Sequence, residues 1–359
     1  MTMTYPTSSQ LSRTRRNRGF GVVELMVAMA ISLLLLGGVV TLFTSSKTTY
    51  ERVEHLSRIQ ETGRFALEAM MRDIRSAGYI GCARTSTFTN TLNTPTELAW
   101  DFADAIRGFD YQSGTTWSPA LPGSMTSPAN GLSGSDAIVL RVPAAADTSA
   151  TLRLTDKMAL PTGTLSIAPV AATATAPLKN GQVVMLADCH ARAVFAISSY
   201  SKTTGVIDHG TGTPGSEGPG NASNDLGHAF EMNSQVVPVR TVAYYIGTSP
   251  VTGRTGLWRI AGAAAAEELV EGVERMELRF GEDTSGDRIA DTYNTAGGVA
   301  DWANVMTVSL ALLVRSTDEY GGERDAKTYT LLDQTFTAPN DRHVRQVFVT
   351  TATLRNRAQ

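Results

Sequence analysis

Glu24 is the residue whose position most clearly requires a chemical explanation, because no other side chain from Phe20 to Phe43 is ionisable. An acidic residue inside a membrane-spanning helix costs about 2.5–3.5 kcal/mol on insertion scales, so we expect a positive group to neutralise it. The segment before it ends in Gly19 and carries only basic charges, from Arg13, Arg15, Arg16 and Arg18. A plain membrane anchor would explain the apolar segment but would leave Glu24 unexplained.

A second candidate site is an acidic turn with the spacing of a calcium loop. Side-chain oxygens stand at loop positions 1, 3, 5 and 9, on Asp283, Ser285, Asp287 and Asp291. Arg288 occupies the position of the usual loop glycine, and Asn294 stands where a bidentate glutamate normally follows. The pattern leaves two interpretations open: a calcium site, or an acidic turn between two strands.

The chain contains two cysteines, Cys82 and Cys189. If this part of the chain is exported, both reach an oxidising compartment, where we expect them to form a disulfide. Closing a loop of about 100 residues contributes up to roughly 4.7 kcal/mol in the chain-entropy model. Two independent buried thiols are the alternative. A metal site at Cys189-His190 lacks visible further ligands.

Composition and missing motifs exclude several function classes. Of the 359 residues, 42% are hydrophobic and 18% are charged, as in a folded globular protein. The formal net charge is −3, and it becomes −7 when residues 1–19, with four basic residues and no acidic one, are removed. A nucleic-acid binder is therefore not expected. We also do not expect an enzyme, because the Gly-x-Ser-x-Gly, His-Glu-x-x-His and phosphate-binding glycine motifs are missing.

The apolar segment from residue 20 to residue 43 is long enough to cross a membrane. As a helix it extends roughly 36 Å, against about 30 Å for a hydrocarbon core. The arginines before it favour a cytoplasmic N-terminus and export of the rest. Apolar residues keep helical spacing to about Ala77, and Gly78 is a stop signal. We divide the chain into a leader (1–19), a transmembrane helix (20–43), its amphipathic continuation (44–80) and an exported β-rich head with loop insertions (81–359).

The head favours antiparallel strands. Apolar and polar residues alternate in Val273–Phe280 and Val305–Arg315. Further strands are predicted at Ala137–Val142, Val183–Ala187, Ala193–Ser199, Val236–Ile246, Leu257–Ile260 and Arg345–Leu354. A short helix is predicted at Ala263–Leu269, and an exposed loop with solvated histidines at Thr203–Asn233. The predicted fold class is α+β, with a long N-terminal helix packed on a mainly antiparallel sheet.

Gly19, Phe20 and Glu24 resemble the signal of the type IV prepilin family, in which a basic leader ends in glycine before phenylalanine and glutamate is the fifth mature residue. The resemblance implies that a prepilin peptidase cleaves between Gly19 and Phe20 and N-methylates Phe20. It also implies that Glu24 is a subunit-docking residue, which meets the terminal amine of a neighbouring subunit. Gly21 and Val22-Val23 depart mildly from the family pattern.

Downstream segments resemble the PilW-type minor pilins. They are residues 75–82, 106–110, 117–122, 135–141 and 345–356. This resemblance implies a structural subunit that helps to prime and assemble type IV pili, which serve twitching motility and adhesion. Its implied partners are other minor pilins, the major pilin and a tip adhesin. The implied location is the inner membrane, with the head in the periplasm, and afterwards the tip or base of the pilus.

Two other functions fit parts of the sequence. A minor pseudopilin of a type II secretion system would share the N-terminal signal. A membrane-anchored periplasmic binding or hydrolytic protein would share only the anchor. Loss of pili and twitching on deletion of the protein would favour the minor pilin over the pseudopilin. A Gly19 substitution that leaves the size and activity of the protein unchanged would favour a plain anchor.

Overall fold

The computed structural model describes residues 21–79, 87–114, 116–121, 134–144, 152–212, 218–262 and 264–356. The chain divides into two compact units, Met1–Glu51 and Arg52–Gln359. The first unit contains the N-terminal part of helix α1. The second contains the C-terminal part of this helix and all the strands.

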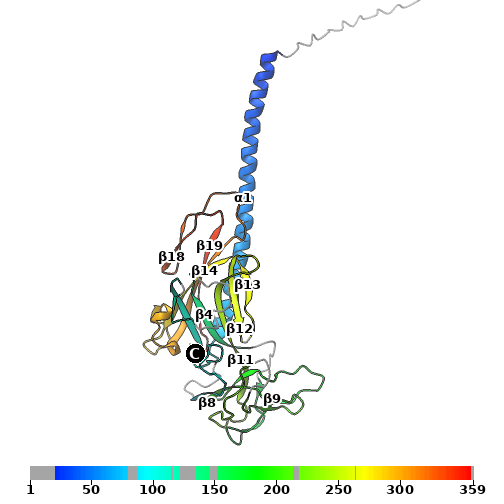
Figure 1. The fold of residues 1–359 in the computed structure, drawn as a ribbon, viewed down its shortest axis with the longest axis vertical. Coiled ribbons are helices and arrows are strands. Elements are labelled where there is room, and N and C mark those ends of the chain that lie inside the picture. The colour runs from blue at the N-terminus through cyan, green and yellow to red at the C-terminus, as the bar shows by residue number, and fades with distance from the viewer. Residues whose placement is uncertain are drawn as a thin grey trace, which may run out of the picture. The chain divides into compact units, whose positions relative to one another are not determined.

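Helix α1 covers Val22–Ser76 without interruption and is drawn in blue in Figure 1. An acidic residue, Glu24, lies in its first turn and a basic one, Arg75, in its last, the distribution that the helix dipole favours. Gly78, at φ 69°, supplies the left-handed backbone that commonly ends a helix. The helix thus ends next to the predicted position. It is long and apolar enough to cross a membrane.

The strands lie in the second unit. They are β1 (Thr87–Asn90), β2 (Ile106–Ser113), β3 (Thr116–Ser118), β4 (Ala137–Pro143), β5 (Leu152–Arg153), β6 (Leu165–Ser166), β7 (Val183–Ala187), β8 (Ala191–Ala196), β9 (Ser199–Tyr200), β10 (Val206–Asp208), β11 (Gln235–Thr248), β12 (Thr255–Ala261), β13 (Glu267–Glu271), β14 (Val273–Glu282), β15 (Thr292–Asn294), β16 (Val305–Arg315), β17 (Thr328–Leu331), β18 (Gln334–Thr337) and β19 (Arg345–Thr353). Two short 3₁₀ helices, η1 (Ala296–Gly298) and η2 (Trp302–Asn304), precede β16.

Strand β11 is the centre of a ten-stranded sheet whose main order is β1-β8-β7-β11-β4-β2-β3. Its first residues pair with β7, and its later ones pair with β4 on one side and β12 on the other. Strand β13 continues the sheet beyond β12, as Figure 1 shows. The β1–β8 pair is parallel, and the other pairs between described strands are antiparallel.

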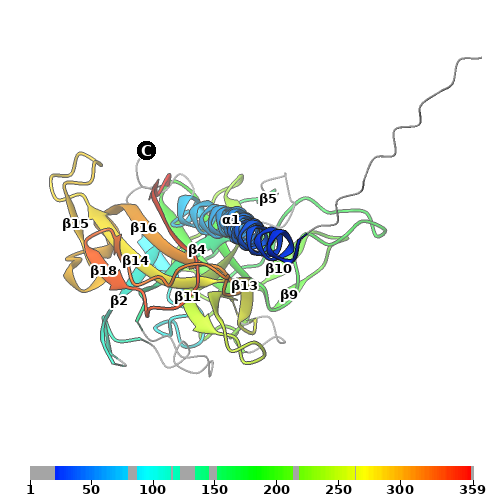
Figure 2. The same cartoon turned by 90° about the horizontal axis from the view of Figure 1, so that it is seen from above.

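A second sheet has the order β15-β14-β16-β19, and Figure 2 shows β14 and β16 side by side. Two smaller sheets contain β6-β10-β9 and β17-β18. The predicted fold class, one long helix and a mainly antiparallel β-domain, is therefore confirmed.

One core cluster joins the C-terminal part of α1 to both large sheets. Ile59, Met70 and Ile74 on the helix pack in the same cluster as Leu140 of β4 and Leu310 of β16. Their spacing places them on one helix face, which is the physical basis of the helical pattern in the sequence. At Gly63 the helix also approaches Phe348 closely. A Cβ there would lie 2.5 Å from the phenylalanine ring, so the position requires glycine unless that ring moves.

Two predictions from the sequence are wrong. No helix forms in the described residues of Ala263–Leu269; their last three belong to β13, because backbone pairing with β12 overrides the local helix propensity of the alanines. The stretch Thr203–Asn233 is also not simply an exposed loop. It contains β10, and His209 is buried with its Nε2 2.7 Å from the carbonyl oxygen of Gly163.

Candidate functional site

The N-terminal turn of α1 places the Glu24 carboxylate at the helix end. The backbone N–H of Gly21 donates a hydrogen bond of 3.2 Å to Oε2 of Glu24, which is half of a capping box. Gly19 and Phe20, the predicted processing residues, lie outside the described residues. The docking role of Glu24 therefore stays a prediction.

The same part of α1 is apolar on all sides and exposed. From residue 21 to residue 47 every residue is exposed, and Val22 and Leu34 keep 77% and 78% of their accessible surface. The mean hydropathy of the most apolar 18-residue window is 2.5. A helix that is apolar all round is stable only in lipid or inside an assembly. This segment therefore has an apolar surface that requires a cover, such as lipid or other apolar helices.

Ser135 and Asp136 join the two large sheets in the head. Oδ1 of Asp136 accepts a hydrogen bond of 2.9 Å from the N–H of Tyr111, and Oδ2 accepts one of 2.8 Å from Leu278. The N–H of Met276 donates to Oγ of Ser135 at 3.1 Å. The residues just before β4 thus connect β2 in the ten-stranded sheet to β14 in the four-stranded sheet.

Several acidic side chains and one arginine lie at the junction between the two sheets. Arg279 lies 4.0 Å from both Asp110 and Asp136, and it also pairs with Asp333. Burial raises the pKa of Asp136, although its two backbone hydrogen bonds oppose the change. Burial, followed by the charge of Asp136, raises the pKa of Glu277 to about 8. The junction therefore contains carboxyl groups that take up protons near neutral pH.

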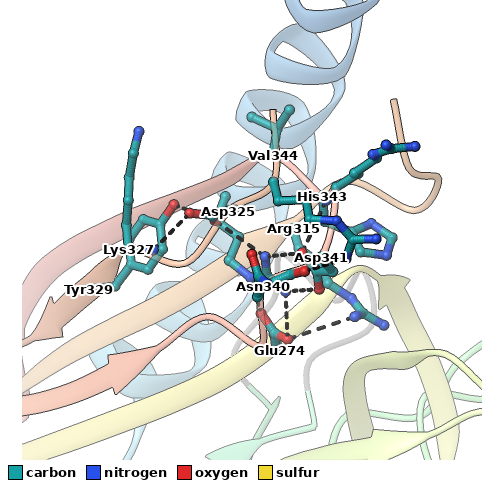
Figure 3. A network of polar contacts seen from close by, with 12 residues as sticks. Glu274, Arg315, Asp325, Lys327, Tyr329, Asn340, Asp341, His343 and Val344 are labelled. Atoms are coloured by element: carbon teal, nitrogen blue, oxygen red, sulfur yellow. Dashed lines mark hydrogen bonds and ion pairs between the residues drawn. The ribbon is translucent and has the colours of Figure 1, made fainter. Parts of the chain in front are cut away.

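Arg345, the first residue of β19, is the centre of a second buried network. Its side chain is fully buried, with Nε 2.7 Å from Glu274 and Nη2 2.6 Å from Asp341. Asp325 lies 3.3 Å from Nη1 and also accepts a hydrogen bond from the Tyr329 hydroxyl. Figure 3 shows the three carboxylates converging from β14 and from the segments around β17 and β18. The hydrogen bonds from Arg345 hold the pKa of Asp341 at about 2.

The acidic turn at residues 283–291 is closed by its own backbone. Oδ1 of Asp283 accepts from the N–H of Gly286 at 2.6 Å, and its Oδ2 accepts from Arg288 at 2.7 Å. Oδ2 of Asp291 accepts from the N–H groups of Thr284 and Ser285. These donors use oxygens that a calcium ion would need.

Across the described residues, no group of three or more His, Cys, Asp or Glu side chains is placed to hold a metal. Calcium binding at Asp283, Ser285, Asp287 and Asp291 stays a prediction. A calcium-dependent change in mass or melting temperature of the folded protein would support it.

Cys189 lies in the turn between β7 and β8. Oδ1 of Asp188 accepts hydrogen bonds of 2.8 Å from the N–H groups of His190 and Ala191, which fixes this turn. Oδ2 of the same carboxylate lies 3.1 Å from Nε2 of His228. Cys82 lies outside the described residues, so its pairing with Cys189 stays a prediction.

Two models of known protein families match parts of the chain. Residues 14–40 match the Prokaryotic N-terminal methylation motif, and residues 243–356 match the family described as Type IV Pilus-assembly protein W. These two matches support a PilW-type protein of the type IV pilin family. No curated protein and no solved structure matches it significantly. The methylation motif includes Gly19, Phe20 and Glu24, so the three predicted N-terminal residues all lie inside the matched segment.

The PilW match extends from β11 to the residues after β19 and includes the Arg345 network. Sequence reasoning did not find this network or the role of Asp136, because their partners are separated by up to 142 residues. One signal was present. Arg345 is a charged residue at the start of a predicted strand, and such a residue needs acidic partners when it is buried.

Proposed function

We propose that this PilW-type minor pilin helps to start the growth of type IV pili by assembling with other minor pilins and the major pilin. The observation that carries the proposal is the exposed, apolar N-terminal part of α1 with Glu24 in its first turn. Such a helix can be stored in a membrane and later buried among similar helices. Pili assembled in this way would serve twitching motility and adhesion, with an adhesin at the tip as a further partner.

Processing is the first step of the proposed function. A prepilin peptidase would cleave the chain between Gly19 and Phe20 and methylate the new amine of Phe20. Glu24 would then accept this amine from a neighbouring subunit. In an apolar surrounding, an ion pair of this kind removes two charges that would each be costly alone.

The proposed location follows from the charges and the length of the N-terminal segment. Before assembly, α1 would lie in the inner membrane with the head in the periplasm. Afterwards the protein would occupy the tip or base of the pilus, since a head of this size would crowd a filament built from many copies. The proposed role is structural, as it is for the family.

A Glu24→Ala variant tests the docking step. We expect a protein that is cleaved, methylated and stable but absent from purified pili, because the amine of its neighbour has lost its partner. Glu54→Gln is the matched control. It removes a negative charge from the same helix, where Glu54 forms an exposed pair with Arg58 at 2.6 Å. Normal recovery of Glu24→Ala in pili would contradict the docking role.

Deletion of the protein separates this function from a secretion system. Loss of surface pili and twitching, with enzyme secretion intact, supports the proposal. Loss of enzyme secretion with intact pili would contradict it and would favour a pseudopilin.

A further inference from the structure

A cavity of about 280 Å³ lies in the second unit, beside the end of α1. Its walls come from Gly78 and Tyr79 after the helix, from β4, and from β8. None of its wall residues belongs to the apolar N-terminal segment, so the assembly role does not account for it.

Arg141 of β4 lines this cavity, and none of the acidic side chains that the structure describes forms a direct ion pair with it. The residue is 5% exposed. Its Nη2 donates a hydrogen bond of 3.0 Å to the carbonyl oxygen of Leu98, while Nε and Nη1 are buried without any hydrogen-bond partner. Asp101 and Asp104 act on it only from a distance, because no ion pair of Arg141 within 4.0 Å occurs among the described residues. Burial lowers the pKa of Arg141 to about 10, so the side chain still carries its charge at neutral pH.

A buried, unpaired Arg141 lowers the stability of the protein when no ligand is bound. A buried charged group without a partner loses its hydration, and most buried charges are therefore paired. The three unused N–H groups on Nε and Nη1 also exceed what native structures usually leave unsatisfied. An anion inside the cavity would remove both costs.

The other walls show what kind of anion would fit. Arg192 of β8 also lines the cavity, and its guanidinium lies 4.6 Å from the ring centre of Phe88. Arg288 is a third cationic wall residue, and none of the wall residues is acidic. Apolar side chains complete the walls, including Phe88, Phe102 and Met185.

We propose that this cavity binds a small organic anion, whose carboxylate pairs with Arg141 and Arg192 while its apolar body contacts the aromatic wall. An inorganic anion would satisfy the arginines but would leave the apolar wall unfilled. A neutral apolar molecule would leave the Arg141 charge unpaired. Binding therefore requires both parts of the ligand.

Three small probes separate these requirements. Benzoate has the ring and the charge, benzyl alcohol has the ring without the charge, and inorganic phosphate has the charge without the ring. The full-length protein in nonionic detergent would be titrated with each probe by calorimetry, and its unfolding midpoint would be measured in parallel. We expect saturable binding of benzoate with a raised midpoint, since a ligand that binds only the folded state stabilises it. Benzyl alcohol and phosphate should bind much more weakly.

Variants then locate the binding. Arg141→Met should weaken benzoate binding by about tenfold to hundredfold, the value of a charge-assisted hydrogen bond. Arg192→Gln should also weaken benzoate binding. Because Arg192 is half-buried and tolerates substitution better, this variant replaces Arg141→Met as the test if Arg141→Met does not fold. Arg254→Gln is the matched control. It removes the same charge from a half-buried arginine that pairs with Asp318 and Glu271 and does not line the cavity.

Each outcome decides the proposal. Benzoate binding that is lost in either cavity variant and kept in Arg254→Gln supports it. Absence of benzoate binding, equal binding of benzyl alcohol or of phosphate, or binding that is unchanged in Arg192→Gln and in a folded Arg141→Met would overturn it.

Discussion

The hydroxyl of Tyr244 donates a hydrogen bond of 2.7 Å to Oδ2 of Asp73. Both residues are buried, with Asp73 on the last turns of α1 and Tyr244 in β11. This polar contact connects the C-terminal part of α1 to the central strand of the largest sheet. Burial, followed by the charge of Asp73, raises the pKa of Tyr244, so the hydroxyl remains a donor at every physiological pH.

Removal of this hydroxyl should destabilise the head. We expect Tyr244→Phe to lower the free energy of unfolding by roughly 1–3 kcal/mol, because the buried Asp73 carboxylate loses a donor. Tyr245→Phe is the control, since the buried hydroxyl of Tyr245 has no hydrogen-bond partner. Chemical denaturation of both variants checks this, and an equal loss in the two would contradict the role of the Asp73 contact.

Arg345 should be the most sensitive charged residue of the head. Arg345→Met leaves Glu274, Asp325 and Asp341 close together without their shared cation, and we expect a loss of about 3–5 kcal/mol in unfolding free energy. Arg324→Gln changes an exposed arginine that donates to the Asn340 carbonyl, and it should cost at most about 0.5 kcal/mol. A small effect of Arg345→Met in urea unfolding would show that the network does not stabilise the fold.

Glu277 should make the stability of the head depend on pH. Its pKa is raised to about 8 in the folded state, above about 4.3 in an unfolded chain. The stabilising contribution of the protonated form is fully present below the unfolded pKa and is lost as the pH rises through the folded pKa. The thermal unfolding midpoint should therefore decrease as the pH rises from about 5 to about 8, and it should decrease more than the midpoint of Glu277→Gln.

Glu277→Gln should show a flatter profile of thermal midpoint against pH. Asp136 retains part of the pH dependence because its pKa is also raised. Glu231→Gln, which removes an exposed carboxylate paired with Lys157, should keep the original profile. Identical profiles for Glu277→Gln and the unchanged protein would contradict the raised pKa.

A disulfide between Cys82 and Cys189 is predicted for protein isolated from an oxidising compartment. Peptide mass spectrometry without reduction should find the two residues cross-linked, and alkylation should modify neither. Removal of the bond by Cys189→Ala should lower the unfolding free energy by about 2–5 kcal/mol. Alkylation of both thiols in the isolated protein would contradict the pairing.

Regular hydrophobic patterns predicted the main elements, because these patterns arise from local geometry. The helical spacing up to Ile74 and the alternation along β14 and β16 each record one buried face. The sequence also predicted strands at the places of β7, β8, β11 and β12. The partners in each of the pairs β7–β8 and β11–β12 are close along the chain.

Long-range contacts could not be predicted in the same way. The parallel pair of β1 with β8 joins segments about 100 residues apart, and β13 forms only because β12 offers it an edge. The sites show the same limit. Gly19, Phe20 and Glu24 form a local motif, whereas the positions of Arg141 and Arg345 depend on the folded core.

The mature N-terminus is the most direct test of the central claim, that this chain enters a pilus through a processed N-terminal helix. Intact-mass and N-terminal peptide analysis should be performed on protein from cells with prepilin peptidase and from cells without it. We predict a chain that begins at Phe20 and carries one methyl group in the first case, and an uncleaved leader in the second. A chain that keeps Gly19 in peptidase-containing cells, or that begins at any other residue, would contradict the account.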